Sequence, residues 1–109
     1  MEELGFVRMK EDGFCRSDIN QHLATGLYMT PSVLACARIC DEHVECAGFS
    51  FHDDKCEVQC DFRTALCRNA EFPVGNMGPA CLDVTDDTPG VSCWVKINSC
   101  GNLRLFHLI

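Results

Sequence analysis

One stretch of the chain carries an apolar stripe with the spacing of a helix. The stripe repeats at positions i, i+3, i+4 and i+7 and consists of Val33, Cys36, Ala37 and Cys40. The polar residues Arg38 and Asp41 fall on the opposite face of the same helix. Thr30 is a suitable N-cap, and Pro31 suits the first helical position, where its missing N–H costs nothing. The pattern therefore predicts a helix that begins after Thr30 and ends near Glu42.

Alternating side chains predict strands on both sides of a short acidic turn. Cys46–His52 is rich in phenylalanine, and its alternate positions share one face of the expected strand. Asp53-Asp54 is a turn signal, after which Lys55–Val58 returns as the partner strand. A further strand is predicted over Ser92–Ile97, where apolar and polar positions alternate again. One helix with several strands predicts an α+β domain.

Both ends of the chain carry apolar segments that we expect to be strands. Phe6–Lys10 alternates apolar and basic residues, and the apolar tail Leu103–Ile109 is expected to pair with it. Residues 69–80 and the acidic stretch Asp83–Gly90 are predicted to be loops. We therefore divide the chain into an N-terminal extension (1–13), a central domain (14–97) and a C-terminal extension (98–109).

The cysteine content indicates a disulfide-linked protein. The chain has 109 residues, and ten of them are cysteine. Because disulfides persist in oxidising compartments, we expect a secreted or extracellular protein. Met1-Glu2-Glu3 does not begin a signal peptide, so a signal would have to be missing from this chain. A cytosolic metal-binding protein is the competing interpretation, and the lack of any C-x2-C motif disfavours it.

The charge of the chain limits its partners. The net charge is −7, and the nine basic residues form no cluster in the sequence. Nucleic acid requires a concentrated positive field, so a nucleic-acid ligand is excluded and a heparin-like polyanion is disfavoured. The longest apolar runs fall well short of the roughly 18 residues that a membrane-spanning helix needs. We therefore expect no membrane insertion.

Neither a catalytic motif nor a metal-binding motif stands out. Gly48–His52 lacks the final glycine of a nucleophile elbow and forms part of a strand. The four histidines are separated, and the acidic stretch 83–87 lacks the glycine and the closing glutamate of an EF-hand. We therefore predict no enzymatic activity, no metal and no other cofactor. Trp94 is expected to pack in the fold rather than to bind a sugar.

Four sequence segments together resemble a PAN/apple domain. The segments are Gly13-Phe14-Cys15-Arg16, Cys36-x3-Cys40-x5-Cys46-Ala-Gly-Phe-Ser-Phe, Cys56, and Cys93-Trp94-Val95-Lys96. The resemblance covers about residues 14–97. It implies one helix packed on a curved antiparallel β-sheet, with disulfides Cys36–Cys56 and Cys40–Cys46 between helix and hairpin. For the apple type it also implies a bridge between Cys15 and Cys93.

Four further cysteines have no counterpart in the family pattern. We expect Cys60 to pair with Cys67 and Cys81 with Cys100, while the other pairings of these four residues stay open. The segment 61–90 is also longer than a minimal hairpin connection.

The resemblance implies an extracellular binding module that recognises proteins or carbohydrates without catalysis. The alternative is a free-standing secreted inhibitor or toxin-like effector that occludes a protein partner. The loops are expected to make the contacts, because connecting segments on a rigid scaffold are common binding sites. The expected contact residues are His52, Asp53, Asp54 and Lys55 in the hairpin tip and Asp83, Asp86 and Asp87 in the acidic loop.

Overall fold

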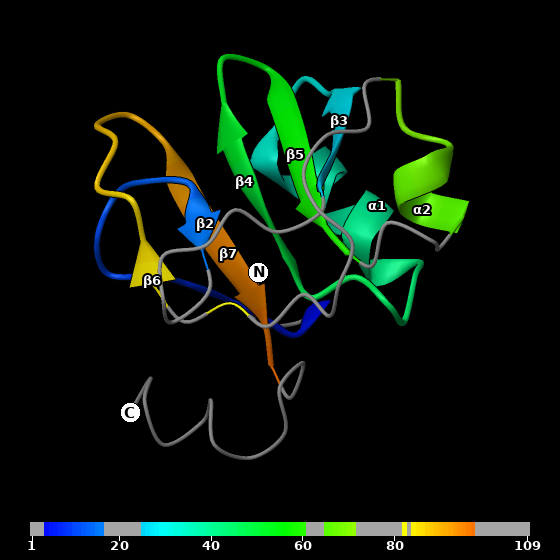
Figure 1. Cartoon of the computed structure of the whole chain (residues 1–109), viewed down its shortest axis with the longest axis horizontal. Helices are drawn as coiled ribbons and strands as arrows, with labels where there is room; N and C mark the ends of the chain where they lie inside the picture. Colours follow the sequence, from blue (N-terminus) through cyan, green and yellow to red (C-terminus); the bar gives the residue numbers. More distant parts are fainter. Residues whose placement is uncertain (1–3, 17–24, 61–64, 72–81, 83, 98–109) are drawn as a thin grey trace.

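The computed structural model describes residues 4–16, 25–60, 65–71, 82 and 84–97 of the chain. This part of the chain is a small α+β fold with two helices, two antiparallel sheets and four disulfides. The large sheet has the strand order β1-β7-β4-β5-β3 (Figure 1). Its strands are β1 (Phe6–Arg8), β3 (Thr25–Met29), β4 (Gly48–His52), β5 (Lys55–Gln59) and β7 (Ser92–Lys96). A small second sheet pairs β2 (Cys15–Arg16) with β6 (Val84–Thr85).

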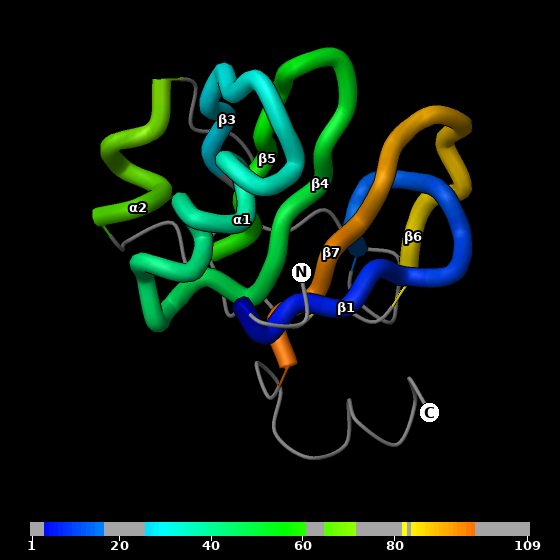
Figure 2. The backbone as a smooth tube through the Cα atoms, turned by 180° about the vertical axis from the view of Figure 1, so that it is seen from behind, coloured from blue at the N-terminus to red at the C-terminus, as the bar shows by residue number. Residues whose placement is uncertain are grey.

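The helix α1 (Val33–Asp41) lies across β4 and β5 on one face of the large sheet, and Figure 2 shows it from that side. Its apolar stripe is buried as predicted at Cys36, Ala37 and Cys40, while Arg38 is exposed. The predicted helix and the β4–β5 hairpin are both confirmed, with a two-residue turn at Asp53-Asp54.

The start of α1 differs from the prediction. The N-cap is Ser32, whose Oγ accepts a hydrogen bond from the Ala35 N–H at 3.1 Å. Thr30 is buried, and its N–H donates to the Asp54 carbonyl at 2.8 Å, so it belongs to the contact with the hairpin. Pro31 precedes the helix rather than opening it. The predicted N-cap Thr30 is therefore wrong by two residues, and Ser32 caps the helix through its exposed hydroxyl.

The end of α1 is fixed by a lysine from β7. Lys96 Nζ donates to the carbonyls of Cys40 and His43 at 3.1 Å and 2.8 Å. Helix C-termini leave carbonyl groups without intrahelical partners, and a cation there is also favoured by the helix dipole. Burial lowers the pKa of Lys96, and the nearby carboxylates of Asp41 and Glu45 act in the opposite direction.

The disulfides join α1 to the sheet and the sheet to the smaller elements. The bridges are Cys36–Cys56, Cys40–Cys46, Cys15–Cys93 and Cys60–Cys67, the same pairs that the sequence analysis expects. The first two hold the helix against β5 and against the segment before β4, and the third ties β2 to β7. The remaining expected pair, Cys81–Cys100, lies outside the described residues.

Apolar side chains pack on both faces of the large sheet. On the helix side, the Phe49 ring contacts Phe6 edge-on with centroids 5.3 Å apart and stacks on Trp94 at 6.2 Å. Trp94 therefore packs against the core, as predicted, and its indole N–H donates to Ser92 Oγ at 2.9 Å. The opposite face buries a smaller cluster consisting of Cys15, Ala47, Leu82, Cys93 and Val95.

Two short elements depart from the sequence-based prediction. A second helix, α2 (Ala65–Arg68), follows β5, where only one helix was expected in the domain. It is too short to show a helical period, and its buried Leu66 and Cys67 attach it to the core. The strand β6 lies inside the stretch predicted to be an acidic loop.

The strand β1 belongs to the sheet rather than to a separate extension. It pairs with β7 in antiparallel register, and Phe6 is buried in the core. The tail Leu103–Ile109, expected as the partner of this segment, lies outside the described residues.

Removing the bridges one at a time should destabilise the fold in the order of the loops that they close. The cysteines of Cys15–Cys93, Cys36–Cys56 and Cys40–Cys46 are 78, 20 and 6 residues apart. The chain-entropy model gives losses of about 4.5, 3.3 and 2.4 kcal/mol for the corresponding Cys→Ala pairs. Urea unfolding of the three double variants measures these losses.

The fourth bridge provides the control. Cys60 and Cys67 are 7 residues apart, so their double alanine variant should resemble the Cys40–Cys46 variant. An equal loss of stability for the shortest and the longest loop would contradict the entropic account.

Candidate functional site

The hairpin tip (His52–Lys55) is one of the two segments that the sequence analysis expects to contact a ligand. Asp53 and Asp54 have φ angles of 46° and 60°, the left-handed conformation that a two-residue type I′ turn requires. Both side chains are exposed. His52 and Lys55 face each other across the ladder and are half-buried. The turn is also held from outside the hairpin, because the Asp54 carbonyl accepts the Thr30 N–H.

A row of side chains crosses three strands next to this tip. His52 pairs with Lys55, and Lys55 pairs with Met29 on the neighbouring strand β3. Residues paired in antiparallel strands point to the same face of the sheet. Ser50, two residues before His52, also points to this face and bonds to β2, so the row lies on the side opposite α1. Met29 is 53% exposed, which makes it one of the few large apolar side chains on the described surface.

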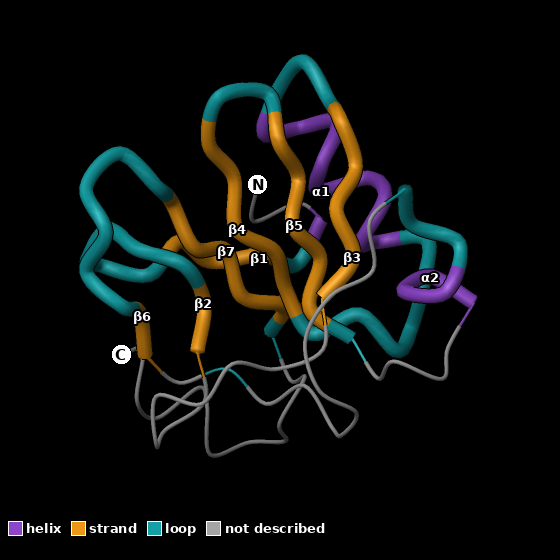
Figure 3. Tube along the Cα trace, turned by 45° about the horizontal axis from the view of Figure 1, so that its top comes forward, coloured by secondary structure: helices purple, strands orange, loops and turns teal. Residues whose placement is uncertain are grey.

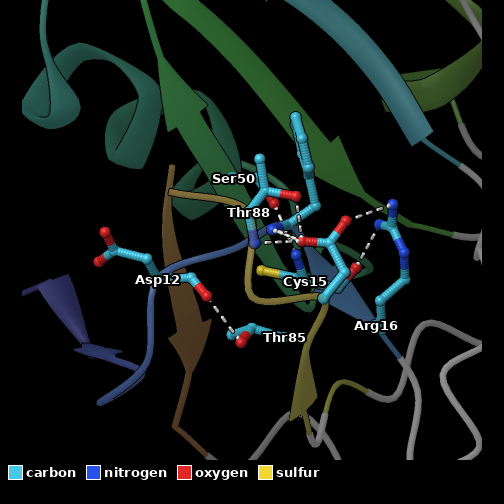
Figure 4. Close-up of polar contacts among 8 residues, drawn as sticks. Asp12, Cys15, Arg16, Ser50, Thr85 and Thr88 are labelled. Atoms are coloured by element: carbon cyan, nitrogen blue, oxygen red, sulfur yellow. Dashed lines mark hydrogen bonds and ion pairs between the residues drawn. The ribbon is translucent and has the colours of Figure 1, made fainter. Parts of the chain in front are cut away.

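The acidic loop is organised around the carboxylate of Asp86. One oxygen, Oδ1, accepts the Phe14 N–H at 2.9 Å, the Thr88 N–H at 3.1 Å and the Thr88 hydroxyl at 2.7 Å. The other, Oδ2, lies 3.3 Å from Arg16 Nη2. Figure 4 shows Arg16 and Thr88 approaching this point from β2 and from the loop after β6. Asp86 is therefore half-buried and already engaged, and it differs in this respect from the exposed contact residue expected from the sequence.

The electrostatics of Asp86 reflect these contacts. Partial burial acts to raise the pKa of its carboxyl group, but hydrogen bonds from Thr88 and Phe14 and the charge of Arg16 outweigh that effect. The pKa of Asp86 is therefore lowered from its ordinary value. The carboxylate stays ionised at neutral pH and holds the loop as an acceptor for several donors.

A buried hydroxyl on β4, that of Ser50, fixes the strand β2 to the large sheet. Ser50 is fully buried, and its Oγ accepts the Cys15 N–H at 2.9 Å (Figure 4). The turn before β2 is held against the acidic loop at a second point, because Thr85 Oγ1 donates to the Asp12 carbonyl at 2.9 Å. At Gly13 a Cβ atom would lie 2.5 Å from the Asp87 backbone nitrogen, so only glycine allows this close approach.

Phe14 brings the two expected contact segments together. Its backbone N–H bonds to Asp86 in the acidic loop, while its ring meets the His52 ring edge-on with centroids 5.1 Å apart. The Arg16 guanidinium lies 5.6 Å from the centroid of the same ring. We call the group formed by Phe14, Arg16, Met29, His52 and Lys55 the Phe14 surface. In Figure 3 the helix α1 lies behind the sheet, α2 lies to the side of β3, and β2 and β6 lie beside β7 and β4.

Several predicted contact residues lie at or near the Phe14 surface, and others do not. His52 and Lys55 belong to it, and exposed Asp53 approaches His52 with 3.8 Å between carboxylate and Nδ1. Asp87 is exposed on the acidic loop, and Asp83 lies outside the described residues.

Phe14, Arg16 and Met29 were not expected at the site. Phe14 and Arg16 stand in the Gly-Phe-Cys-Arg segment that supported the family resemblance, but nothing local in the sequence places them beside His52.

The described residues contain no group of three or more histidine, cysteine or acidic side chains arranged to hold a metal. In the same ranges no helix is long and apolar enough to cross a membrane. The geometry of the Phe14 surface, with an aromatic ring, a methionine and basic side chains in contact or in register, suits non-covalent recognition.

Comparison with protein-family models finds no match to this chain, and neither curated proteins nor solved structures show a significant similarity to it.

Asp86→Asn should weaken the fold at neutral pH and reduce its sensitivity to acid. The pKa of Asp86 is depressed in the folded state, so its contribution is present above the unfolded pKa of about 3.9 and is lost as pH falls through the folded value. At pH 7 we expect a loss of about 1–3 kcal/mol in the free energy of unfolding. The difference between wild type and variant should shrink below about pH 4.

Urea unfolding over a pH series measures both effects. Asp87→Asn is the matched control, because it removes one neighbouring carboxylate that is exposed and for which the described residues supply no ion pair. It should change stability by less than about 0.5 kcal/mol. A constant gap between wild type and Asp86→Asn down to strongly acidic pH would show that the carboxylate charge does not hold the loop.

Proposed function

We propose that the chain is a PAN/apple-like domain that acts as an extracellular binding module. Three disulfides, Cys36–Cys56, Cys40–Cys46 and Cys15–Cys93, agree with the pairing that the family resemblance implies. The placement of α1 on an antiparallel sheet is compatible with the same family. Multiple disulfides are typical of extracellular proteins.

The Phe14 surface is the observation that carries the proposal. Its members come from three separate parts of the chain and are held together by contacts that leave little freedom: the Phe14–His52 ring contact, the Asp86 carboxylate and the Cys15–Cys93 bridge. A surface fixed before binding loses less conformational entropy when a ligand arrives.

A protein partner is favoured over a carbohydrate by the residue types of this surface. Aromatic residues, methionine and arginine are enriched at protein interfaces, and the Phe14 surface contains one of each together with Lys55 and His52. Met29 in particular exposes an apolar, adaptable side chain next to Lys55. A glycan ligand is the second outcome that the experiment below distinguishes.

Binding should be lost when the Phe14 surface is changed. The oxidised chain is tested at physiological salt in a pull-down from extracellular proteins and on a glycan array. For any partner found, Phe14→Ala and Met29→Ser should each weaken binding about tenfold, because truncation of a central interface side chain commonly costs more than about 1 kcal/mol. A count of free thiols in each variant serves as a check, because finding none verifies that the variant retains its bridges.

Leu34→Ser is the matched control for Met29→Ser. Leu34 is a large apolar side chain, 41% exposed, on the helix α1 at the other face of the sheet. Its substitution should leave binding within about twofold of the wild type. Binding of no protein and no glycan by the oxidised chain, or equal losses for Leu34→Ser and Met29→Ser, would overturn the proposal.

A further inference from the structure

A groove of about 280 Å³ lies between the segment that follows β1 and the strand β6. It is lined by Met9, Lys10, Glu11, Val84, Thr85 and Asp87. None of these residues belongs to the Phe14 surface. The volume lies just below the range of roughly 300–1,000 Å³ of small-molecule sites, so the groove suits a single extended side chain.

Both walls of the groove are anchored by hydrogen bonds. The Met9 N–H donates to the Cys93 carbonyl at 2.8 Å, and the Gly13 N–H donates to the Val91 carbonyl at 2.7 Å. The opposite wall is tied to the first one through Thr85 Oγ1 and the Asp12 carbonyl. The groove is therefore formed before any ligand binds, which lowers the cost of ordering on binding.

The interior of the groove is apolar. Met9 and Val84 are half-buried, and Met9 also packs against the cluster of buried side chains around Cys15 and Leu82. These two side chains offer a contact surface for methylene groups.

The rim of the groove carries a net negative charge. Glu11 and Asp87 are exposed, and within the described part of the chain no ion pair engages either carboxylate. The neighbouring carboxylates are occupied: Asp12 lies 2.7 Å from Arg8, and Asp86 pairs with Arg16. Lys10 supplies one positive charge, so two carboxylates against one ammonium leave a net charge of −1 among the lining residues.

We propose that this groove binds a long basic side chain, lysine or arginine, presented by a protein partner. Such side chains combine an apolar stem with a charged end, and the stem would lie on Met9 and Val84 while the cation reaches Glu11 and Asp87. The net charge of −7 on the whole chain attracts a basic partner as well. This inference rests on the proposed role as a binding module, and it assigns one partner feature to a place apart from the Phe14 surface.

The test uses three short peptides that differ at one side chain. The oxidised chain labelled with nitrogen-15 is titrated with Ac-Gly-Arg-Gly-NH2, with the lysine analogue and with the citrulline analogue. Arginine or lysine should shift the amide signals of Met9, Glu11, Val84 and Asp87 with a dissociation constant on the order of 1 mM. The neutral citrulline peptide should bind at least about threefold more weakly, and added salt should weaken the charged peptides.

Removing an acidic charge and removing a basic charge from the rim should change the dissociation constant in opposite directions. Glu11→Gln and Asp87→Asn should each raise the dissociation constant of the arginine peptide about threefold. Asparagine tolerates the φ angle of 64° at position 87, so the loop conformation is retained. Lys10→Gln should lower the dissociation constant, because it removes a repulsive charge. Glu71→Gln, an exposed glutamate outside the groove, is the control and should leave binding unchanged.

Any of four results would overturn the proposal, and the first three concern the size of an effect. They are equal binding of the citrulline and arginine peptides, an equal effect of Glu71→Gln and Glu11→Gln, and weaker binding by Lys10→Gln. Absence of any signal shift with the charged peptides would do the same. If the groove binds no basic peptide while a partner still binds through the Phe14 surface, this inference is wrong and the proposed function stands.

Discussion

The attachment of α1 to the β4–β5 hairpin through two disulfides is the constraint on which the rest of the structure depends. Cys36 and Cys40 lie one helical turn apart, so a single helix face reaches both Cys56 and Cys46. This fixes the direction of the helix across the sheet as well as its distance from it. The buried residues between the bridges, Ala37 and Phe49, then pack against a partner whose position is already determined.

The two loops near the Phe14 surface are held by different means. The hairpin tip owes its shape to backbone geometry, since the Asp53-Asp54 turn needs two left-handed residues between paired strands. The acidic loop owes its shape to a side chain, since Asp86 gathers donors from β2 and from Thr88. The conformation of the tip is therefore determined by the hairpin itself. The conformation of the acidic loop also depends on β2, which is bonded to Ser50.

The sequence predicted those parts of the fold that are encoded over a few neighbouring residues. The stripe of α1, the β4–β5 hairpin and the alternation of β7 each span enough residues to show a period. Strands β2 and β6 are two residues long and depend on distant partners, as does the short helix α2. The hairpin tip is local in the sequence, so it could be predicted as a contact segment. Phe14 and Met29 come from distant parts of the chain, so their position beside the tip could not be predicted. Register across strands and the fold around Ser50 create that neighbourhood.

The Cys15–Cys93 bridge encloses most of the described chain within one covalent loop. A single cut in the backbone anywhere between these two cysteines leaves both fragments joined through sulfur. A protease that nicks a surface loop in this interval therefore releases no piece of the domain, and the two fragments separate only after reduction. In an environment rich in proteases, the molecule can thus be cleaved once in this interval and still remain one covalently linked molecule.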